Sequence, residues 1–459
     1  MAETDSPLNI SVTTRQDPDN NKRLIREISL PYGQIESSIR VTADPASTQE
    51  DARAAWWWSY LHGKKARSST EHGTLRVAEM FGGPGGLAQG VKQFCREAGL
   101  IFESRAVVDQ DIGAVDVYIQ NHHTPEEHTA RCATSSVIDH ELDADSGKWP
   151  STGWTASNAP IITELHPKWR DLRGELDLLL AGPPCQGHSN LNNWSRYDDD
   201  RNEAYLDVPA LAVALDVPLV IIENVPSVVH DARKVVAKAH KLFTGNGYHV
   251  ESGTLKADLM GWPQTRARFF LIARKDENPP LSLAGIQDAL TWPEGESSLD
   301  LWWAIHDLAQ ASSEDHHMHR IANYTTQNRR RINYLHGKGS DNFNLPVSRH
   351  NEKHKKGTTY TGVYGRLNPE APAGTITSGF LTPGRGRYVH PTERRTITPA
   401  EAARIQGFPD NYIFDVDGIA PSKQQLTKWI GDAVPMPLGY AAAMSALGPG
   451  IPRPEASDG

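Results

Sequence analysis

Six short apolar runs, mostly separated by helical stretches, constrain the fold of this 459-residue chain more than any other feature. The runs occupy residues 75–81, 104–111, 177–182, 218–225, 248–255 and 268–274. Continuous apolar strands that alternate with helices are typical of a parallel sheet covered on both faces. The sequence therefore predicts an α/β fold with a doubly wound, Rossmann-like parallel sheet.

Residues able to do chemistry stand at the ends of several of these runs. In open parallel sheets, ligands bind beyond the carboxyl ends of the strands. The candidates at such positions are the glycine turn after Phe81, Asp109, Cys185 and Glu223. We therefore expect these residues to lie along one edge of the sheet.

The glycine turn "FGGPGGLAQG" (residues 81–90) lies between an expected strand and an expected helix. Glycines there let the backbone approach a ligand closely, and the helix N-terminus adds N–H donors. Asp109 follows after about 25 residues, where an acid can accept from ribose hydroxyls. The pattern favours an adenosine-bearing cofactor, and the alternative is a plain tight turn.

Cysteine is scarce, with Cys95, Cys132 and Cys185 and no CxxC pair. A disulfide framework or a structural zinc site is therefore not expected, and a reducing cytoplasm fits best. Cys185 follows Gly-Pro-Pro just beyond a strand, so its backbone is held rigidly. A thiolate there could act as a nucleophile, whereas a lone buried cysteine is more often a small hydrophobe.

Glu223 ends the apolar strand "PLVIIENV". Burial would raise its pKa and make it a proton donor near neutral pH, and the alternative is a helix cap. Gln264, Arg266 and Arg268 occupy every second position leading into the apolar strand at 268–274, so their side chains share one face of it. Their guanidinium groups could hold a phosphate or a base carbonyl, or form surface ion pairs.

The alternation stops after residue 275. Residues 276–394 are rich in Pro, Gly, Asn, His and Arg, which predicts a separate, irregular domain. Within residues 320–395 there are 14 Lys and Arg against 4 Asp and Glu, although the chain carries a net charge of −9. This excess predicts contact with a polyanion or, alternatively, a solvated basic face. "TPAE" at Thr398 begins a capped helix, and a last apolar helix at 437–447 is expected to return to the sheet.

Residues 1–70 form a polar extension of unknown role that is expected to pack on the residues after it. Its tryptophan triplet, residues 56–58, favours packing over a ligand cage. No run approaches the length of a membrane span, and the N-terminus lacks a signal-peptide pattern. Three histidines within 316–319 lack framing acids or cysteines, so no metal is expected.

Taken in order, these motifs resemble those of prokaryotic-type DNA (cytosine-5)-methyltransferases. The resemblance covers roughly residues 75–274 and 395–447. It implies S-adenosyl-L-methionine as the cofactor, bound by Phe81, Gly83, Gly85, Gly86, Asp109, Gln110, Asp139, Pro183 and Asp432. It implies Cys185, Glu223, Arg266 and Arg268 as the catalytic residues.

The same resemblance implies a domain order: a catalytic domain at 71–275, a target-recognition domain at 276–394, and a C-terminal segment, 395–459, that returns to the catalytic domain. This sequence departs from the family pattern at two positions, with His188 in place of Phe and Asp432 in place of Asn. Residues 125–175 make the interval before Cys185 longer than usual.

The implied reaction is methylation of cytosine C5 in double-stranded DNA. Cys185 would attack C6, Glu223 would bind N3, and Arg268 with Arg266 would hold O2. The base must be flipped out of the duplex, and the polar segment 186–206 is expected to close over it. A monomer acting on DNA, with a possible cognate restriction endonuclease, is expected. The alternatives are an RNA cytosine-5 methyltransferase and a catalytically inactive DNA-binding homologue.

Overall fold

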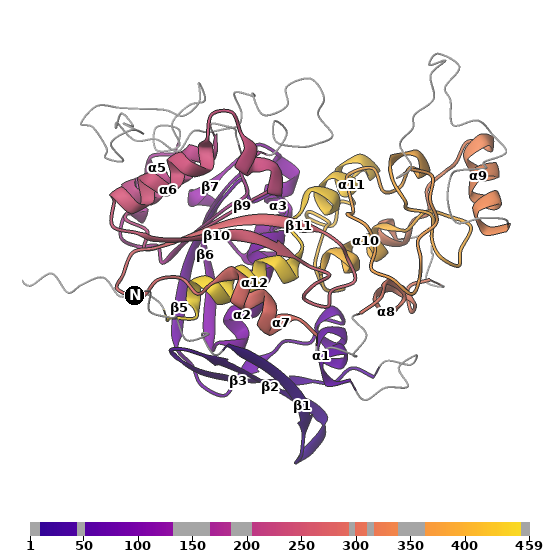
Figure 1. Ribbon diagram of the computed structural model, residues 1–459. Coiled ribbons are helices and arrows are strands. Elements are labelled where there is room, and N and C mark those ends of the chain that lie inside the picture. Colours follow the sequence, from indigo (N-terminus) through magenta and orange to yellow (C-terminus); the bar gives the residue numbers. More distant parts are fainter. Residues whose placement is uncertain are drawn as a thin grey trace, which may run out of the picture.

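The computed structural model describes residues 10–43, 51–131, 166–184, 204–292, 299–309, 316–337 and 363–450. Its centre is a seven-stranded sheet of order β10-β11-β9-β8-β5-β6-β7 (Figure 1). All six predicted strands are present within a few residues of their expected bounds. The strands are β5 (Gly73–Met80), β6 (Leu100–Val108), β7 (Thr129–Ala130), β8 (Leu178–Ala181), β9 (Leu219–Asn224), β10 (His249–Lys256) and β11 (Ala267–Arg274).

The predicted doubly wound, mainly parallel sheet is present, and one strand, β11, departs from the parallel direction. β5, β6, β7, β8 and β9 pair in parallel, whereas β11 is antiparallel to both of its neighbours, β9 and β10. The reason is the connection: residues 257–266 are too few for a crossover of a dozen or more residues, so the chain must turn back. The reversal brings the start of β11 to the edge where β8 and β9 end.

Helices cover both faces of the sheet, as predicted. Leu178 and Leu180 pack in one core with α2 (Gly86–Glu97) and α12 (Met436–Leu447), and Leu179 and Ala181 pack in a second core with α5 (Ala204–Ala214) and α6 (Val235–Gly245). This alternation follows from the two-residue period of a strand. The last apolar helix does return to the sheet, since α12 contacts β9, β11 and α2.

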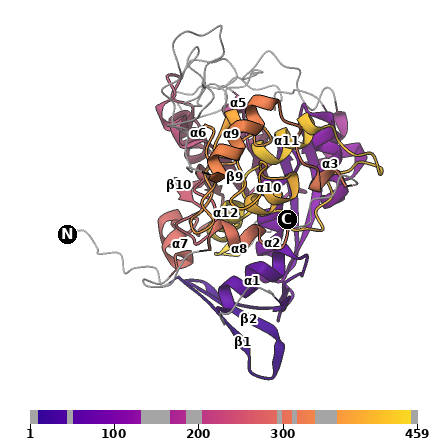
Figure 2. The same ribbon diagram turned by 90° about the vertical axis from the view of Figure 1, so that its right-hand side faces the viewer.

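The N-terminal extension is a folded unit, which was not among the predictions from the sequence. It forms an antiparallel sheet of β1 (Ser11–Asp17), β2 (Asn20–Leu30), β3 (Gly33–Arg40) and β4 (Arg67–Ser68), with helix α1 (Ala52–Leu61) between β3 and β4. The sheet lies below the central one in Figures 1 and 2. Part of the signal was in the sequence: "EISL" (residues 27–30) alternates in polarity, and "DPDN" and "PYG" are turn-forming sequences.

A small domain lies beside the sheet domain, at the right of Figure 1. It contains α8 (Leu301–Ile305), α9 (Thr326–Gly337), α10 (Pro399–Gln406) and α11 (Lys423–Asp432). Its core joins Ile376 and Phe380 to Ile405 and Trp429, so residues from both sides of position 395 contribute. By contrast, α7 (Leu283–Leu290) packs on β10 and α12 of the sheet domain. The domain boundaries expected from the sequence stay predictions.

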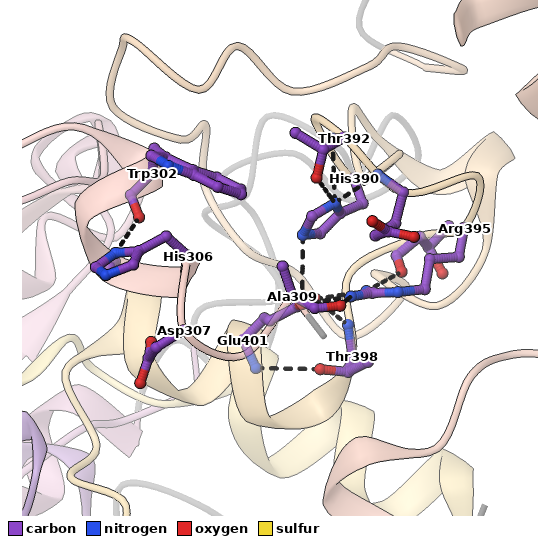
Figure 3. A network of polar contacts seen from close by, with 12 residues as sticks. Trp302, His306, Asp307, Ala309, His390, Thr392, Arg395, Thr398 and Glu401 are labelled. Atoms are coloured by element: carbon purple, nitrogen blue, oxygen red, sulfur yellow. Dashed lines mark hydrogen bonds and ion pairs between the residues drawn. The ribbon is translucent and has the colours of Figure 1, made fainter. Parts of the chain in front are cut away.

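A buried carboxylate, Glu401, organises the small domain (Figure 3). The predicted capping box is present, with Thr398 and Glu401 each bonding the other's backbone N–H at the start of α10. Arg395 donates to both Glu401 oxygens at 2.7 Å, and His390 Nε2 lies 3.3 Å from Oε1. Burial opposes ionisation, but the bonds from Arg395 and His390 prevail and lower the Glu401 pKa to about 2. Glu401 is therefore a fixed negative charge within the small domain.

Two features are absent from the described residues. None of their helices is both long and apolar enough to cross a membrane. Across those residues, no group of three or more His, Cys, Asp or Glu side chains is arranged to hold a metal ion. His316 and His317 do stack, and His317 Nε2 lies 2.6 Å from Asp415, which gives that histidine an ion-pair geometry.

Candidate active site at the carboxyl edge of the sheet

The glycine turn after β5 is shaped as an open cradle. Phe81, Gly83 and Gly85 all have positive φ, at 55°, 51° and 90°. A β-carbon at Gly83 would project into open space, whereas one at Gly85 would lie 2.6 Å from His122 Nε2. Gly85 is also the N-cap of α2, so free N–H groups of the first helical turn face the cradle. This geometry fits a cofactor that approaches the backbone closely.

Asp109 holds this turn from the end of β6. Its carboxylate accepts N–H groups from Gly83 at 3.0 Å and from Asp111 at 2.8 Å. Burial raises the pKa of Asp109, and these two backbone bonds oppose the rise. Gln110, between the two acids, is exposed. Asp109 thus shapes the cradle, and its predicted contact with a ribose stays a prediction.

The final sequence motif, "GDAVP", meets the start of α2. A β-carbon at Gly86 would lie 2.5 Å from the Val434 carbonyl oxygen, so only glycine permits this approach. Asp432 ends α11 nearby, where Lys428 Nζ lies 2.9 Å from Asp111 and 3.8 Å from Asp432. The structure therefore brings Asp432 to the side of the cradle, although its carboxylate is largely exposed.

Glu223 and Arg268 form an ion pair at the same edge. Arg268 Nε lies 2.7 Å from Glu223 Oε1, and both side chains are mostly buried. The pair exists because β11 is antiparallel to β9: Phe270 is registered opposite Glu223, so the start of β11 lies beside the end of β9. Burial raises the pKa of Glu223, while Arg268 and Arg266 oppose the rise.

Arg266 has a different environment from Arg268. Its guanidinium is buried and donates to the carbonyl oxygens of Ile376 at 2.8 Å and Gly431 at 2.9 Å. It therefore ties the start of β11 to two parts of the small domain, the segment at Ile376 and helix α11. Arg268 is the ion-pair partner of Glu223, and a direct catalytic role for Arg266 stays a prediction.

The segment that leads to Cys185 is anchored next to Glu223. Asn224 Nδ2 donates to the Pro183 carbonyl at 3.2 Å, and a β-carbon at Gly182 would lie 3.8 Å from Glu223 Oε2. Cys185 itself, Asp139, His188 and residues 186–203 of the loop predicted at 186–206 lie outside the described residues. The prediction is wrong for residues 204–206, which form the start of helix α5. The structure thus brings together the approach to Cys185, Glu223 and Arg268.

Two residues near the cradle were not among the candidates from the sequence. Glu79 is buried within β5, and burial raises its pKa to about 8. A β-carbon at Gly82 would lie 3.3 Å from its Cγ, so this carboxyl lies beneath the turn. Tyr412 donates its hydroxyl to the Pro84 carbonyl. An acid inside the apolar run "LRVAEMF" was a signal for Glu79, whereas nothing local marked Tyr412.

Comparison with known proteins agrees with this geometry. The sequence model of the family described as "C-5 cytosine-specific DNA methylase" matches residues 75–447. The chain is 34% identical over 387 residues to the type II methyltransferase M1.BsuMI of Bacillus subtilis, covering 83% of each chain. It is 28% identical over 380 residues to the type II methylase M.HgiDII of Herpetosiphon aurantiacus, covering 80% of this chain and 94% of that one.

A solved structure shows the same fold. The Dnmt2 methyltransferase of S. pombe aligns with a TM-score of 0.51 and 16% identity over 81% of this chain and 98% of that one. The fold and the cradle define an S-adenosylmethionine-dependent methyltransferase. The chain belongs to the C-5 cytosine-specific DNA methylase family, and it is an enzyme that methylates C5 of cytosine in DNA.

Proposed function

We propose that this enzyme methylates cytosine in double-stranded DNA through a covalent bond between Cys185 and C6 of a flipped base. The ion pair of Glu223 with Arg268, beside the anchored Pro183, is the observation that carries this proposal. It places two adjacent groups of opposite charge where a cytosine ring could meet them: Glu223 for N3 and Arg268 for O2.

The roles of the side chains follow from the electronic needs of the ring. Attack by the Cys185 thiolate at C6 moves the C5–C6 π electrons toward N3 and O2. Glu223, whose pKa burial raises, holds or supplies a proton at N3, and Arg268 stabilises charge at O2. Residues 81–86 of the cradle, with Asp109 and Asp432, would hold S-adenosylmethionine, whose sulfonium gives its methyl group to C5 and departs as S-adenosylhomocysteine. Loss of the C5 proton to water, departure of the thiolate from C6 and return of the N3 proton to Glu223 then restore the aromatic ring.

The small domain is proposed to contact the DNA. Nine arginines of the basic segment are described, and six of them are exposed: Arg320, Arg329, Arg330, Arg385, Arg387 and Arg394. Exposed arginines suit phosphate contacts, which orient a protein on the duplex before bases are read. The net charge of the chain is negative, so a local basic surface is what permits DNA binding.

We further propose that the enzyme acts as a monomer and protects DNA against a cognate restriction endonuclease. The names of M1.BsuMI and M.HgiDII, both type II enzymes, support such a pairing. Bisulfite sequencing of DNA from cells that express the enzyme would reveal the methylated sequence. Protection of that sequence from an endonuclease encoded nearby is the expected result, and the absence of any such nuclease would contradict the pairing.

The covalent step is tested with Cys185→Ser. We expect the methylation rate to fall at least about a thousandfold, because the nucleophile is lost, while S-adenosylmethionine binding measured by calorimetry is retained. Duplex DNA carrying 5-fluorocytosine at the target should trap the parent enzyme as a covalent complex and should not trap the variant. A variant that still forms the adduct would refute Cys185 as the nucleophile.

A further inference from the structure

Helix α1 of the N-terminal extension contacts both domains of the enzyme. Figure 2 shows α1 above the N-terminal sheet and below both α2 and α8, and Figure 1 shows it at the lower edge of both domains. The family match begins at residue 75, so α1 is an addition to the family's core. We propose that α1 is an interdomain brace that fixes the small domain, and with it the proposed DNA-contacting arginines, relative to the cofactor cradle.

The tryptophan triplet divides its contacts between the two domains. Trp56 Nε1 donates to Glu97 of α2 at 3.3 Å, and Trp57 packs edge-on against Tyr440 of α12 with ring centroids 5.5 Å apart. Trp58 instead stacks on His306, just beyond α8, at 4.9 Å with the planes 10° apart. Successive residues of a helix point about 100° apart, so three neighbours can reach different partners. Trp56 and Trp57 thus face the cofactor domain, and Trp58 faces the small domain.

The buried hydroxyl of Tyr60 bonds to both domains. Gln89 of α2 donates to Tyr60 Oη at 3.0 Å, and that hydroxyl donates to the Gly407 carbonyl at 3.0 Å. Gly407 is the C-cap of α10, and α2 begins at the cofactor cradle. Tyr60 therefore connects the cradle helix to the end of α10 through two hydrogen bonds in a region closed to water.

The C-terminal end of α1 completes the brace. Asp410 N–H donates to the Leu61 carbonyl at 2.7 Å. His62 Nε2 lies 3.1 Å from Asp307, which Arg404 also contacts. Burial opposes ionisation of Asp307, but the bonds from His62 and Arg404 prevail and hold its pKa well below the usual value. The charged groups that fix α8 to α10 are therefore shared with α1.

In this proposal Trp58, Tyr60 and His62 are positioning residues. None of them belongs to the site at the sheet edge. The direct contacts of Arg266 with Ile376 and of Trp262 with Ile405 also join the domains. Loss of the brace should therefore loosen the domain arrangement without separating the domains. Its effect on DNA rests on the proposed function, in which the small domain contacts the duplex.

The test uses two pairs of matched variants. Trp58→Leu is compared with Trp56→Leu, because both tryptophans are almost completely buried on the same helix and differ in the domain they face. Tyr60→Phe is compared with Tyr440→Phe, because both lose one buried hydroxyl. The Tyr440 hydroxyl donates to Glu97 of α2 at 2.7 Å, which places this bond in the cofactor domain. The tyrosine pair keeps the test decisive if the leucine variants fold poorly.

The first readout is the distance between the domains, measured by electron–electron double resonance. Spin labels are placed on exposed positions of each domain, at Ile101→Cys and Ile419→Cys, in a Cys132→Ser, Cys185→Ser background of the full chain. We expect broader distance distributions in Trp58→Leu and Tyr60→Phe, and parent-like distributions in the two controls. Unchanged distributions in both brace variants would overturn the brace.

The second readout is steady-state methylation with Cys185 present. We expect the KM for DNA to rise about tenfold in Trp58→Leu and Tyr60→Phe, while the Kd for S-adenosylmethionine changes less than about twofold. The same rise in the controls would mean general destabilisation and would overturn the positioning roles. Broader distances with an unchanged KM for DNA would support the brace and contradict the proposed DNA contact of the small domain.

Discussion

Two buried glutamates, one in each domain, are held in opposite ways. Glu223 at the sheet edge has one ion pair in the described residues, with Arg268, and burial raises its pKa. Glu401 in the small domain receives bonds from Arg395, His390 and the Thr398 backbone, and its pKa falls to about 2. The comparison shows that a sparsely bonded carboxylate is ready for proton chemistry, whereas a saturated one stabilises a fold.

The largest expected effect is on catalysis, in Glu223→Gln. We expect the methylation rate to fall between about a hundredfold and ten-thousandfold, because the amide cannot take up or supply a proton at N3. The free energy of unfolding should fall by about 1 to 2 kcal/mol, because Arg268 loses its carboxylate partner but is 14% exposed and keeps its bond to the Ala267 carbonyl. Kinetics and urea denaturation on the same preparation measure both quantities. A variant destabilised as strongly as Glu401→Gln would contradict the proposed difference between the two glutamates.

Glu401→Gln should behave in the reverse manner. It leaves Arg395 as a buried charge without its carboxylate, so we expect a loss of about 3 kcal/mol in unfolding free energy. The methylation rate at a temperature where the variant is folded should change little for a substrate at saturation. Urea denaturation measures the first quantity, and an unaffected midpoint would show that the Glu401 network contributes no stability.

The pH dependence of stability should follow Glu401. Because its folded pKa lies below the ordinary value of 4.5, its contribution is fully present above pH 4.5 and is lost as the pH falls toward about 2. We expect a loss of about 2 kcal/mol between pH 7 and pH 3 from this group. The free energy of unfolding of the parent and of Glu401→Gln, measured at a series of pH values, would show this loss. An equal pH dependence in the two proteins would contradict it.

The smallest expected effect is that of Asp432→Asn, which restores the residue that the family usually has. The Asp432 carboxylate is largely exposed and lies near Lys428, so solvent screens its charge. We expect the Kd for S-adenosylmethionine to change by less than about threefold. Calorimetry measures it, and a change of tenfold or more would show that the proposed cofactor contact depends on the charge of Asp432.

The two domains also differ in how far the sequence predicted them. The six strands, the glycine turn and the capping box at Thr398 are local patterns, in which periodicity or turn chemistry reports the backbone directly. The N-terminal sheet was only partly predictable, from the short alternating run "EISL" and the turn-forming sequences around it, within a polar composition. The small domain shows few local sequence patterns. Part of its stability comes from ion pairs such as Arg404 with Asp307, whose partners stand about 100 positions apart in the sequence.

The sequence by itself determined which residues carry the chemistry. It placed a thiol, a carboxylate and a guanidinium near strand ends, in the same order along the chain as the motifs of cytosine-5 methyltransferases. Only the tertiary structure decided their arrangement. The antiparallel direction of β11 brings Arg268 to Glu223, because a reversed strand starts where its neighbours end. Arg266, two residues earlier, instead binds two carbonyl groups of the small domain, those of Ile376 and Gly431. Alternation along the strand places both arginines on one face and so could not predict this difference.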